Sequence, residues 1–372
     1  MKLIINQEIL IEHLNYVIKG ISSRNLIPIL NCIKLSLKKD GLYLSSTDNE
    51  IGIQSFIDKK DLEVKELGDI VLPGRLFYEI IRKLNNEKIN IDELIDSKIN
   101  IYTDNSSFTL TCNNANEFPD LELDKLNDPI EINKTIFRNI INQTIFATST
   151  QESRPVLTGI NFKFENKELI CTATDSYRLA TKKIELTDIK NKKHNIIIPT
   201  KNLQELIRML DEDEELLEIY IFDNKVIFKF NSIILLTRII NGAFPTTEKL
   251  IPEDFSIVLK INSKELYSAI DRASLLTNES EKNTIKFETK KGVATISSTI
   301  PEIGYVEEKI DISNDLKEEI KISFSSKYML EALKSFDCEE INLMFNGEIK
   351  PIIIKNPSSD DLIQLILPIR TY

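Results

Sequence analysis

Histidine and cysteine are the side chains that most often hold metals or act as nucleophiles, and both are scarce in this chain of 372 residues. The two histidines, His13 and His194, stand alone, so the HExxH zinc motif is absent and a histidine-based triad would have to be assembled through space. The four cysteines are dispersed without a CxxC pair, which predicts neither a zinc site nor a redox dithiol. We therefore expect no metal, no cofactor and a reducing cytoplasmic environment.

Phosphate cradles and clustered carboxylates are the next places to look for chemistry. The ten glycines form no GxGxxG, Walker or GxSxG pattern, which excludes the nucleotide and nucleophile sites built on those motifs. The densest acidic run is Asp211–Glu215. Such runs are mostly solvated helix ends or loops, so we expect a solvated segment there rather than a metal site. These patterns predict no catalytic residue.

Charge and composition limit the class of protein. Lys and Arg number 47 against 58 Asp and Glu, and the net charge of −11 should repel free duplex DNA, so any nucleic-acid role must be local or topological. Hydrophobic residues make up 42% and charged residues 28%, as in ordinary globular proteins, and the length predicts two or three domains. No apolar run is long enough for a signal peptide or a membrane span, so we expect neither secretion nor a membrane partner.

A threefold internal repeat supplies the elements that position any site. The segment Pro28–Asp48 matches Pro155–Asp175 without a gap, and a weaker third copy starts at Ile285. The first two copies alternate apolar and polar residues across a short turn, which predicts an antiparallel hairpin and hence antiparallel sheet in the repeat unit. The apolar positions of the first hairpin are Ile33, Leu35, Leu37, Leu42 and Leu44.

Two amphipathic helices are predicted in each repeat. The first helix precedes the hairpin and opens with Ile-Asn, and the asparagines Asn6, Asn133 and Asn262 are suitable N-caps. The second helix follows the hairpin, in the segments that start at Val71, Ile197 and Ser323. One face of each second helix forms an apolar stripe that we assign to the core. The stripes contain Ile80, Ile81 and Leu84; Leu206, Ile207 and Leu210; and Ala332, Leu333 and Phe336.

Opposite each stripe lie two basic residues, seven positions apart and nearly eclipsed on the helix. They are Arg75 and Arg82, Lys201 and Arg208, and Lys327 and Lys334. One interpretation is a solvated helix face, on which Glu79, Glu205 and Glu331 pair with the first basic residue four positions earlier. The other is a positive surface gathered on one side of an acidic protein. The recurrence in three diverged copies favours the positive surface.

The repeats also predict the domain organisation. Pro- and acid-bearing connectors follow Phe118 and Phe244, so we expect an α+β protein with three domains at residues 1–124, 125–252 and 253–372.

Four short motifs carry a resemblance to a known family. They are ATDSYRLA from Ala173, GAFPTTEKLIP from Gly242, SRNLIPIL from Ser23, and the C-terminal LPIRTY. Their order and spacing over the full length resemble the bacterial DNA polymerase III β subunits, the replicative sliding clamps. The resemblance implies three tandem repeats of the DNA-clamp fold in a head-to-tail homodimeric ring, with helices inside and antiparallel sheets outside. Such a ring is noncatalytic, encircles double-stranded DNA without sequence specificity, and confers processivity in DNA replication.

The resemblance also implies partners and site residues. The replicative DNA polymerase, the clamp loader and repair proteins would bind through a short clamp-binding peptide, in the cytoplasm and at the nucleoid during replication. The family's DNA-contacting positions match Arg24, Arg75 and Gln151, to which the repeated basic positions Arg82, Lys201, Arg208, Lys327 and Lys334 are added. Aromatic DNA contacts of some members fall on Pro155 and Val156 here.

Two further surfaces follow from the resemblance. The partner-peptide pocket matches Thr174, Ser176, Tyr177, Arg178, Leu179, Pro245, Leu250, Leu365, Leu367, Pro368, Ile369 and Arg370, with Leu157 beneath. Apolar walls of this kind accept the hydrophobic side chains of an extended peptide. The dimer interface matches Phe108, Leu110, Leu275 and Leu276, and Glu302, Glu307 and Glu308 could add ion pairs across it.

Other interpretations stay open at this level. A threefold-repeat scaffold could recognise peptides without DNA, and an enzyme could use Asp175, Tyr177 and Arg178, although Asp and Arg so close in sequence more simply form a structural ion pair. LPIRTY alone would be an ordinary C-terminal strand, and the four interface residues could be ordinary core.

Overall fold

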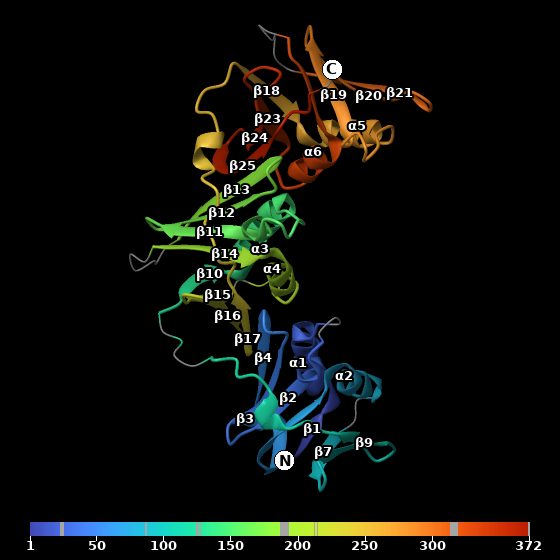
Figure 1. Ribbon diagram of the computed structural model, residues 1–372, viewed down its shortest axis with the longest axis vertical. Coiled ribbons are helices and arrows are strands. Elements are labelled where there is room, and N and C mark those ends of the chain that lie inside the picture. Colours follow the sequence, from blue (N-terminus) through green and yellow to red (C-terminus); the bar gives the residue numbers. More distant parts are fainter. Residues whose placement is uncertain are drawn as a thin grey trace. The chain divides into compact units, whose positions relative to one another are not determined.

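The computed structural model describes residues 1–22, 26–85, 88–123, 126, 128–186, 193–211, 213, 215–312 and 319–370. The chain forms two compact units, drawn in Figure 1. The first contains Met1–Phe137 and Lys201–Ile239, and the second contains Arg138–Thr200 and Ile240–Tyr372. Each unit holds two antiparallel sheets, and the middle repeat contributes strands to both units.

The first unit contains a five-stranded and an eight-stranded sheet. The five-stranded sheet has the order β5 (Leu62–Glu66), β1 (Lys2–Asn6), β7 (Lys88–Leu94), β8 (Lys98–Tyr102) and β9 (Ser107–Thr111). The eight-stranded sheet has the order β10 (Ile130–Asn133), β15 (Leu216–Ile221), β16 (Lys225–Phe230), β17 (Ile233–Arg238), β4 (Ile51–Asp58), β3 (Gly41–Thr47), β2 (Cys32–Leu37) and β6 (Gly68–Pro73).

The second unit contains an eight-stranded and a four-stranded sheet. The larger sheet has the order β14 (His194–Pro199), β11 (Gly159–Glu165), β12 (Glu168–Thr174), β13 (Arg178–Glu185), β25 (Ser359–Ile366), β24 (Ile352–Asn356), β23 (Glu340–Phe345) and β18 (Ile257–Asn262). The smaller sheet has the order β21 (Gly304–Asp311), β20 (Val293–Ile300), β19 (Thr284–Lys290) and β22 (Lys321–Ser325).

Two helices per repeat pack against these sheets, as the sequence predicts. They are α1 (Gln7–Val17), α2 (Gly74–Lys83), α3 (Lys134–Thr144), α4 (Thr200–Ile207), α5 (Ser263–Ser274) and α6 (Ser326–Leu333). Each of the three asparagine caps is confirmed, because the side chains of Asn6, Asn133 and Asn262 accept hydrogen bonds from first-turn amides. The three predicted hairpins are the antiparallel pairs β2–β3, β11–β12 and β19–β20.

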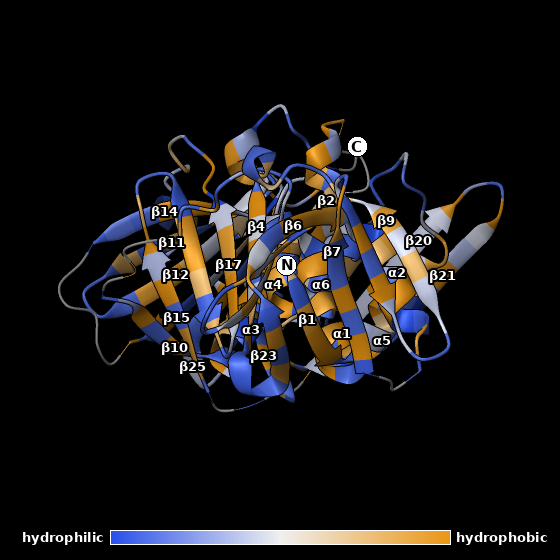
Figure 2. Ribbon diagram, turned by 90° about the horizontal axis from the view of Figure 1, so that it is seen from below, coloured by the Kyte–Doolittle hydropathy of each residue, from blue (hydrophilic) through white to orange (hydrophobic). Residues whose placement is uncertain are grey.

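The core lies between the helices and the sheets. The alternation of the strands is visible as bands of hydrophobic and hydrophilic colour in Figure 2. In the third repeat Phe287 packs between Phe324 and Phe345, with ring centroids 6.4 Å and 6.1 Å away. The predicted stripes of the second helices are buried except at Ile207, which is half-buried.

The acidic run differs from its prediction as a simply solvated segment. Lys134, fully buried at the start of α3, donates from Nζ to Asp213 (3.0 Å), Glu215 (2.8 Å) and the amide oxygen of Asn231 (2.8 Å). Burial opposes the charge of this amine, but its hydrogen bonds to Glu215 and Asp213 prevail and raise its pKa. Asp213 and Glu215 therefore neutralise a buried cation. The local density of acidic residues in the sequence does not reveal this partner.

Neighbouring repeats join edge to edge through one pair of strands. Strand β17 of the second repeat pairs with β4 of the first, with Leu235 opposite Ile53. Strand β25 of the third repeat pairs with β13 of the second, with Gln364 opposite Ala180. Each joint thus connects the last strand of one repeat to the strand that follows the hairpin in the repeat before it.

Candidate functional site

The six basic positions of the second helices are all exposed, while the opposite stripe is buried. Their ion pairs differ from the expected i, i+4 pattern. Glu79 pairs with Arg82 (2.6 Å) and Glu205 pairs with Arg208 (2.8 Å), which are the second basic residues of their helices. An i, i+3 spacing lets the Arg fork reach back one turn, and Glu331 instead pairs with Arg178. The expectation that these glutamates pair with the first basic residue was wrong.

The first basic residue of each helix is consequently less neutralised. Within the described residues Arg75 and Lys327 form no ion pair, and Lys201 lies 3.6 Å from Asp48. Lys334 lies over the ring of Tyr267, 5.5 Å from its centroid. The hydrogen bond from Arg82 to Glu79 raises the pKa of Arg82. Each helix therefore keeps an exposed cation even where a glutamate is present.

Other predicted DNA-facing residues have mixed outcomes. Gln151 is exposed, and its backbone N–H donates to Ser149 Oγ at 3.0 Å. Arg24 lies outside the described residues. Lys19, which was not among the predicted positions, donates to the backbone carbonyl of Arg208 at 3.4 Å and lies 5.8 Å from the Tyr16 ring centroid. It has no basic counterpart in the other repeats.

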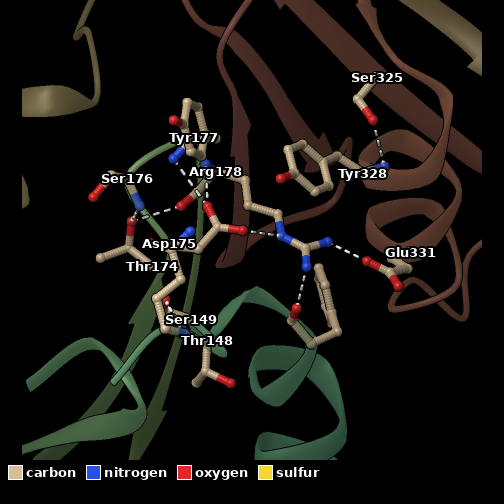
Figure 3. A network of polar contacts seen from close by, with 12 residues as sticks. Thr148, Ser149, Thr174, Asp175, Ser176, Tyr177, Arg178, Ser325, Tyr328 and Glu331 are labelled. Atoms are coloured by element: carbon tan, nitrogen blue, oxygen red, sulfur yellow. Dashed lines mark hydrogen bonds and ion pairs between the residues drawn. The ribbon is translucent and has the colours of Figure 1, made fainter. Parts of the chain in front are cut away.

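The segment ATDSYRLA forms a tight turn between β12 and β13. The carboxylate of Asp175 accepts from the amides of Tyr177 (2.9 Å) and Arg178 (3.0 Å), and Thr174 Oγ1 donates to the Arg178 carbonyl (2.6 Å). Ser176 takes a positive φ of 76°, which closes the turn. Figure 3 shows the result, in which Tyr177 projects from the turn. Its side chain is 54% exposed.

Arg178 is buried, and each of its three guanidinium nitrogens donates a hydrogen bond within the chain. Nε donates to Asp175 at 3.0 Å, Nη1 donates to Glu331 on α6, and Nη2 donates to the Phe146 carbonyl. The guanidinium also lies 4.3 Å from the Tyr328 ring centroid. The structural ion pair between Asp175 and Arg178 is thus confirmed, and Arg178 positions the turn rather than offering a free donor.

A pocket of 710 Å³ opens beside Tyr177. It brings together five of the residues predicted for the partner pocket: Tyr177, Leu367, Pro368, Ile369 and Arg370. The C-terminal segment is held there by two backbone hydrogen bonds, from Leu367 N–H to the Tyr177 carbonyl (2.9 Å) and from Ile369 N–H to the Ser323 carbonyl (2.7 Å). LPIRTY is therefore docked on the fold through its described residues.

The other lining residues were not predicted for this pocket, and Lys327 among them was predicted for the DNA-facing surface. They are Glu279, Lys282, Asn283, Ser325, Lys327 and Tyr328. These residues come from the segment between α5 and β19, from the end of β22 and from the first turn of α6, all distant from Tyr177 in sequence. No local pattern links them to the C-terminal motif, because the tertiary packing of the third repeat brings them together.

The remaining predicted pocket residues lie outside this lining. Leu157, Thr174, Leu179 and Leu365 are buried, and Leu179 and Leu365 form a small cluster with Ile353 against which Ile251 packs. Ser176, Pro245 and Leu250 are exposed, with Leu250 51% accessible. At the same connector, a Cβ built on Gly242 would come within 2.7 Å of Val156, so the glycine permits a close approach to Pro155–Leu157.

The four predicted interface residues lie at the surface or half-buried. Phe108, on β9, is 38% exposed and Leu275, after α5, is 80% exposed, while Leu110 and Leu276 are half-buried. The alternative that these are ordinary core residues is therefore wrong for Phe108 and Leu275. Sequence reasoning missed Ile303 and Tyr305, which are also exposed beside or on β21. β9 and β21 are both edge strands.

The glutamates considered for ion pairs across an interface have partners within the chain. Arg272 donates to Glu308 from Nε (3.0 Å) and Nη2 (2.6 Å), and Lys309 lies 3.0 Å from Glu307. These contacts lower the pKa of both carboxyl groups. Glu302 is exposed. The apolar residues are thus the better indicators of an interface.

The described residues also bear on metal sites, reactive thiols and membrane-spanning helices. Within those residues no three His, Cys, Asp or Glu side chains gather as a metal would require, and the four cysteines are free thiols. Burial raises the pKa of Cys171 well above its ordinary value, which makes that thiol unreactive. Among the same residues, no helix has both the length and the apolar character needed to cross a membrane.

Comparisons with known proteins agree along the whole chain. Residues 1–122, 131–246 and 248–370 match the models of the N-terminal, central and C-terminal domains of the DNA polymerase III beta subunit. A beta sliding clamp from Staphylococcus aureus (strain Mu50) is 41% identical over 377 residues, with full coverage of both chains. The chain belongs to the DNA polymerase III beta subunit family.

Solved structures of sliding clamps match equally well. The crystal structure of the DNA polymerase sliding clamp from Bacillus subtilis has a TM-score of 0.97 at 40% identity, and the beta chain from Streptococcus pneumoniae has a TM-score of 0.94 at 32% identity. Each match covers all of both chains. The predicted family and the three-domain α+β sliding-clamp fold are confirmed. As a family member, this sliding clamp serves DNA replication as a noncatalytic subunit.

Proposed function

We propose that two copies of this sliding clamp associate head to tail into a ring that encircles duplex DNA and tethers the replicative polymerase to it. The strand joints between repeats carry the proposal. β4 pairs with β17 and β13 pairs with β25, whereas the corresponding strands β21 and β9 are left as edges. They belong to the third and the first repeat, so a second copy can satisfy both edges and close the assembly.

The existing joints predict the register of the missing one. Leu235 and Gln364 occupy the same place in their repeats as Phe108, and their partners Ile53 and Ala180 correspond to Val306. Phe108 of one copy should therefore lie opposite Val306 of the other. The exposed Leu275, Ile303 and Tyr305 would cover the apolar patch beside this joint.

The basic helix positions would face the DNA backbone in such a ring. Exposed Arg75 and Lys327 are available to phosphates, while Arg82 and Arg208 share their charge with a glutamate. Binding of this kind is weak and independent of sequence. A closed ring needs only weak contacts, because topology rather than affinity keeps it on the DNA. The positions we assign to this surface are Arg24, Arg75, Arg82, Gln151, Lys201, Arg208, Lys327 and Lys334.

The 710 Å³ pocket beside Tyr177 would receive a short peptide of the polymerase, the clamp loader or repair proteins. The exposed aromatic face of Tyr177 and the chain from Leu367 to Arg370 offer apolar contacts and backbone groups to an extended segment. Leu250 and Pro245 would extend this surface along the connector. The first and second domains of this proposed clamp end at residues 124 and 252. The protein would work in the cytoplasm and, during replication, at the nucleoid.

Deletion of residues 367–372 tests the proposal. The deleted chain should still form a ring, because β25 ends at Ile366, but it should no longer stimulate the replicative polymerase. A charge-reversal variant with Arg82→Glu and Arg208→Glu should instead keep peptide binding and lose DNA-dependent stimulation. Full stimulation by the deletion variant would contradict the pocket, and full stimulation by the charge-reversal variant would favour a scaffold that acts without DNA.

A further inference from the structure

The sheet face that carries a position-matched Lys–Ser pair in the first and third hairpins, here called the outward face, is lined by different segments in the two repeats. Lys34 on β2 lies opposite Ser45 on β3, and Lys286 on β19 lies opposite Ser297 on β20, so the same Lys–Ser pair occupies the same hairpin position. In the first repeat this pair lines a hollow of 510 Å³ that is also lined by the connector residues 115, 116, 118–121 and 123. The connector thus passes over the outward face.

The connector over the first repeat contains both acidic and apolar residues. Phe118 and Leu121 are nearly buried, and Leu121 occupies the space above Gly52, where a Cβ would come within 2.8 Å of it. Its carboxylates stay at the surface, and Glu122 pairs with Lys225 at 3.0 Å. The second repeat shows a related contact, in which Lys163 on β11 lies 3.4 Å from Glu248 of the next connector. The connector after the first repeat thus meets a lysine of β16 in the second repeat, and the next connector meets a lysine of β11. In both places a chain segment with acidic residues contacts a lysine at a sheet surface.

In the third repeat the corresponding sheet face opens into a hollow of 820 Å³. Four basic residues line it, Lys282, Lys286, Lys321 and Arg370, against one carboxylate, Glu281. Its hydroxyl groups come from Ser280, Thr284, Ser297, Ser298, Thr299 and Ser323. Lys286 and Lys321 share Glu288, while Lys282 and Arg370 form no ion pair within the described residues. This is a positive, hydrogen-bonding surface on a chain of net charge −11.

We propose that this face, here called the third-repeat face and defined by Lys282, Lys286, Lys321, Arg370 and Ser297, docks an extended acidic segment of a partner protein. The segment would lie where the connector lies in the first repeat. The third-repeat face shares Lys282, Ile369 and Arg370 with the 710 Å³ pocket, so one partner chain can occupy both. The inference rests on the proposed function for that pocket and adds the charge of the flanking residues.

The chain supplies its own probe. A dye-labelled, C-terminally amidated peptide with the sequence of residues 116–123, NEFPDLEL, carries three side-chain carboxylates, and its neutral counterpart NQFPNLQL carries none. In fluorescence anisotropy at low salt, the acidic peptide should bind the full-length protein about tenfold more tightly than the neutral one, as the product of three exposed ion pairs. The Lys286→Gln/Lys321→Gln variant should lose this preference, and Lys290→Gln, at an exposed position at the end of β19, should keep it.

Equal binding of the two peptides, or an unchanged preference in the double variant, would overturn the inference. So would tighter binding of a single-stranded oligonucleotide that the double variant loses, because the face would then be a nucleic-acid site. Thermal unfolding of the double variant checks that it remains folded. The peptide-binding assay contains no polymerase, so the two proposals can fail separately. If the protein stimulates polymerase but shows no preference for the acidic peptide, only this inference is wrong. If it prefers the acidic peptide but does not stimulate polymerase, the proposed function is wrong.

Discussion

Arg178, at the start of β13, donates a hydrogen bond to Glu331 on α6, 153 residues further along the chain. The same guanidinium holds Asp175 at 3.0 Å and lies on the ring of Tyr328. The buried Arg178 side chain therefore links the turn that carries Tyr177 to the helix that carries Tyr328 (Figure 3). Both tyrosines line the pocket, so the shape of the pocket depends on this residue.

Replacing Arg178 should damage stability and peptide binding together. Arg178→Ala removes the side-chain donor to Asp175 Oδ2 and the donor to the Phe146 carbonyl. Losing one partner of a largely buried pair costs about 3 kcal/mol of unfolding free energy. Urea unfolding measures this loss, and anisotropy with a clamp-binding peptide measures the affinity. Arg154→Ala, which removes only an exposed hydrogen bond to Ser176, is the control and should change neither. Similar stability of the two variants would contradict the positioning role.

The glutamates of the second helices should tune DNA retention. Glu79→Gln frees Arg82 from its 2.6 Å ion pair, so loaded rings should stay longer on DNA, and each added phosphate contact should steepen the log–log salt dependence by about 0.9. Arg75→Ala should have the opposite effect. Retention on nicked circular plasmid, followed as NaCl is raised, measures both changes. Glu66→Gln, on edge strand β5 of the same repeat, is the matched control. Identical retention of all four proteins would exclude these helices from the DNA surface.

His13 should make stability depend on pH. Burial lowers the pKa of His13 below its ordinary 6.5, against the opposing charges of Glu12 and Asp61, and its Nδ1 lies 2.5 Å from Ser55 Oγ. Because the folded-state pKa is the lower one, the contribution to stability is present above about pH 6.5 and is lost as pH falls through the folded value. Urea unfolding from about pH 7.5 to pH 5 should show a steeper loss for wild type than for His13→Gln. Parallel curves would show that His13 contributes nothing.

The register across the proposed joint can be tested by cross-linking. With the partly exposed Cys112 and Cys338 changed to serine, Phe108→Cys and Val306→Cys should be joined by a short bismaleimide into a covalent dimer. The pairing Phe108→Cys with Lys309→Cys is displaced by three residues, about 10 Å along the strand, and should react poorly. Denaturing gels give the yields. A higher yield for the displaced pair would show that the joint does not copy β17–β4.

Local patterns in the sequence predicted the elements well. The asparagine caps, the three hairpins and the paired helices all depend on residues close in sequence, and the repeat tests each pattern three times. Contacts between distant residues were harder to foresee. The pairing of Glu331 with Arg178, the burial of Lys134 among Asp213 and Glu215, and the place of Tyr328 in the pocket all arise from packing between strands and helices far apart in the chain. The motif resemblance located Tyr177 and the C-terminal segment that line the pocket, but not the α6 residue Tyr328.

The proposed ring is most directly tested by single-particle imaging of the purified protein. We predict closed rings of two chains with pseudo-sixfold symmetry and a central hole wide enough for duplex DNA, in which β9 of each copy meets β21 of the other. Leu275→Asp, which places a charge in the apolar patch, should give open single chains under the same conditions. Wild-type particles that are single chains without a hole, or dimers joined away from β9 and β21, would contradict the account.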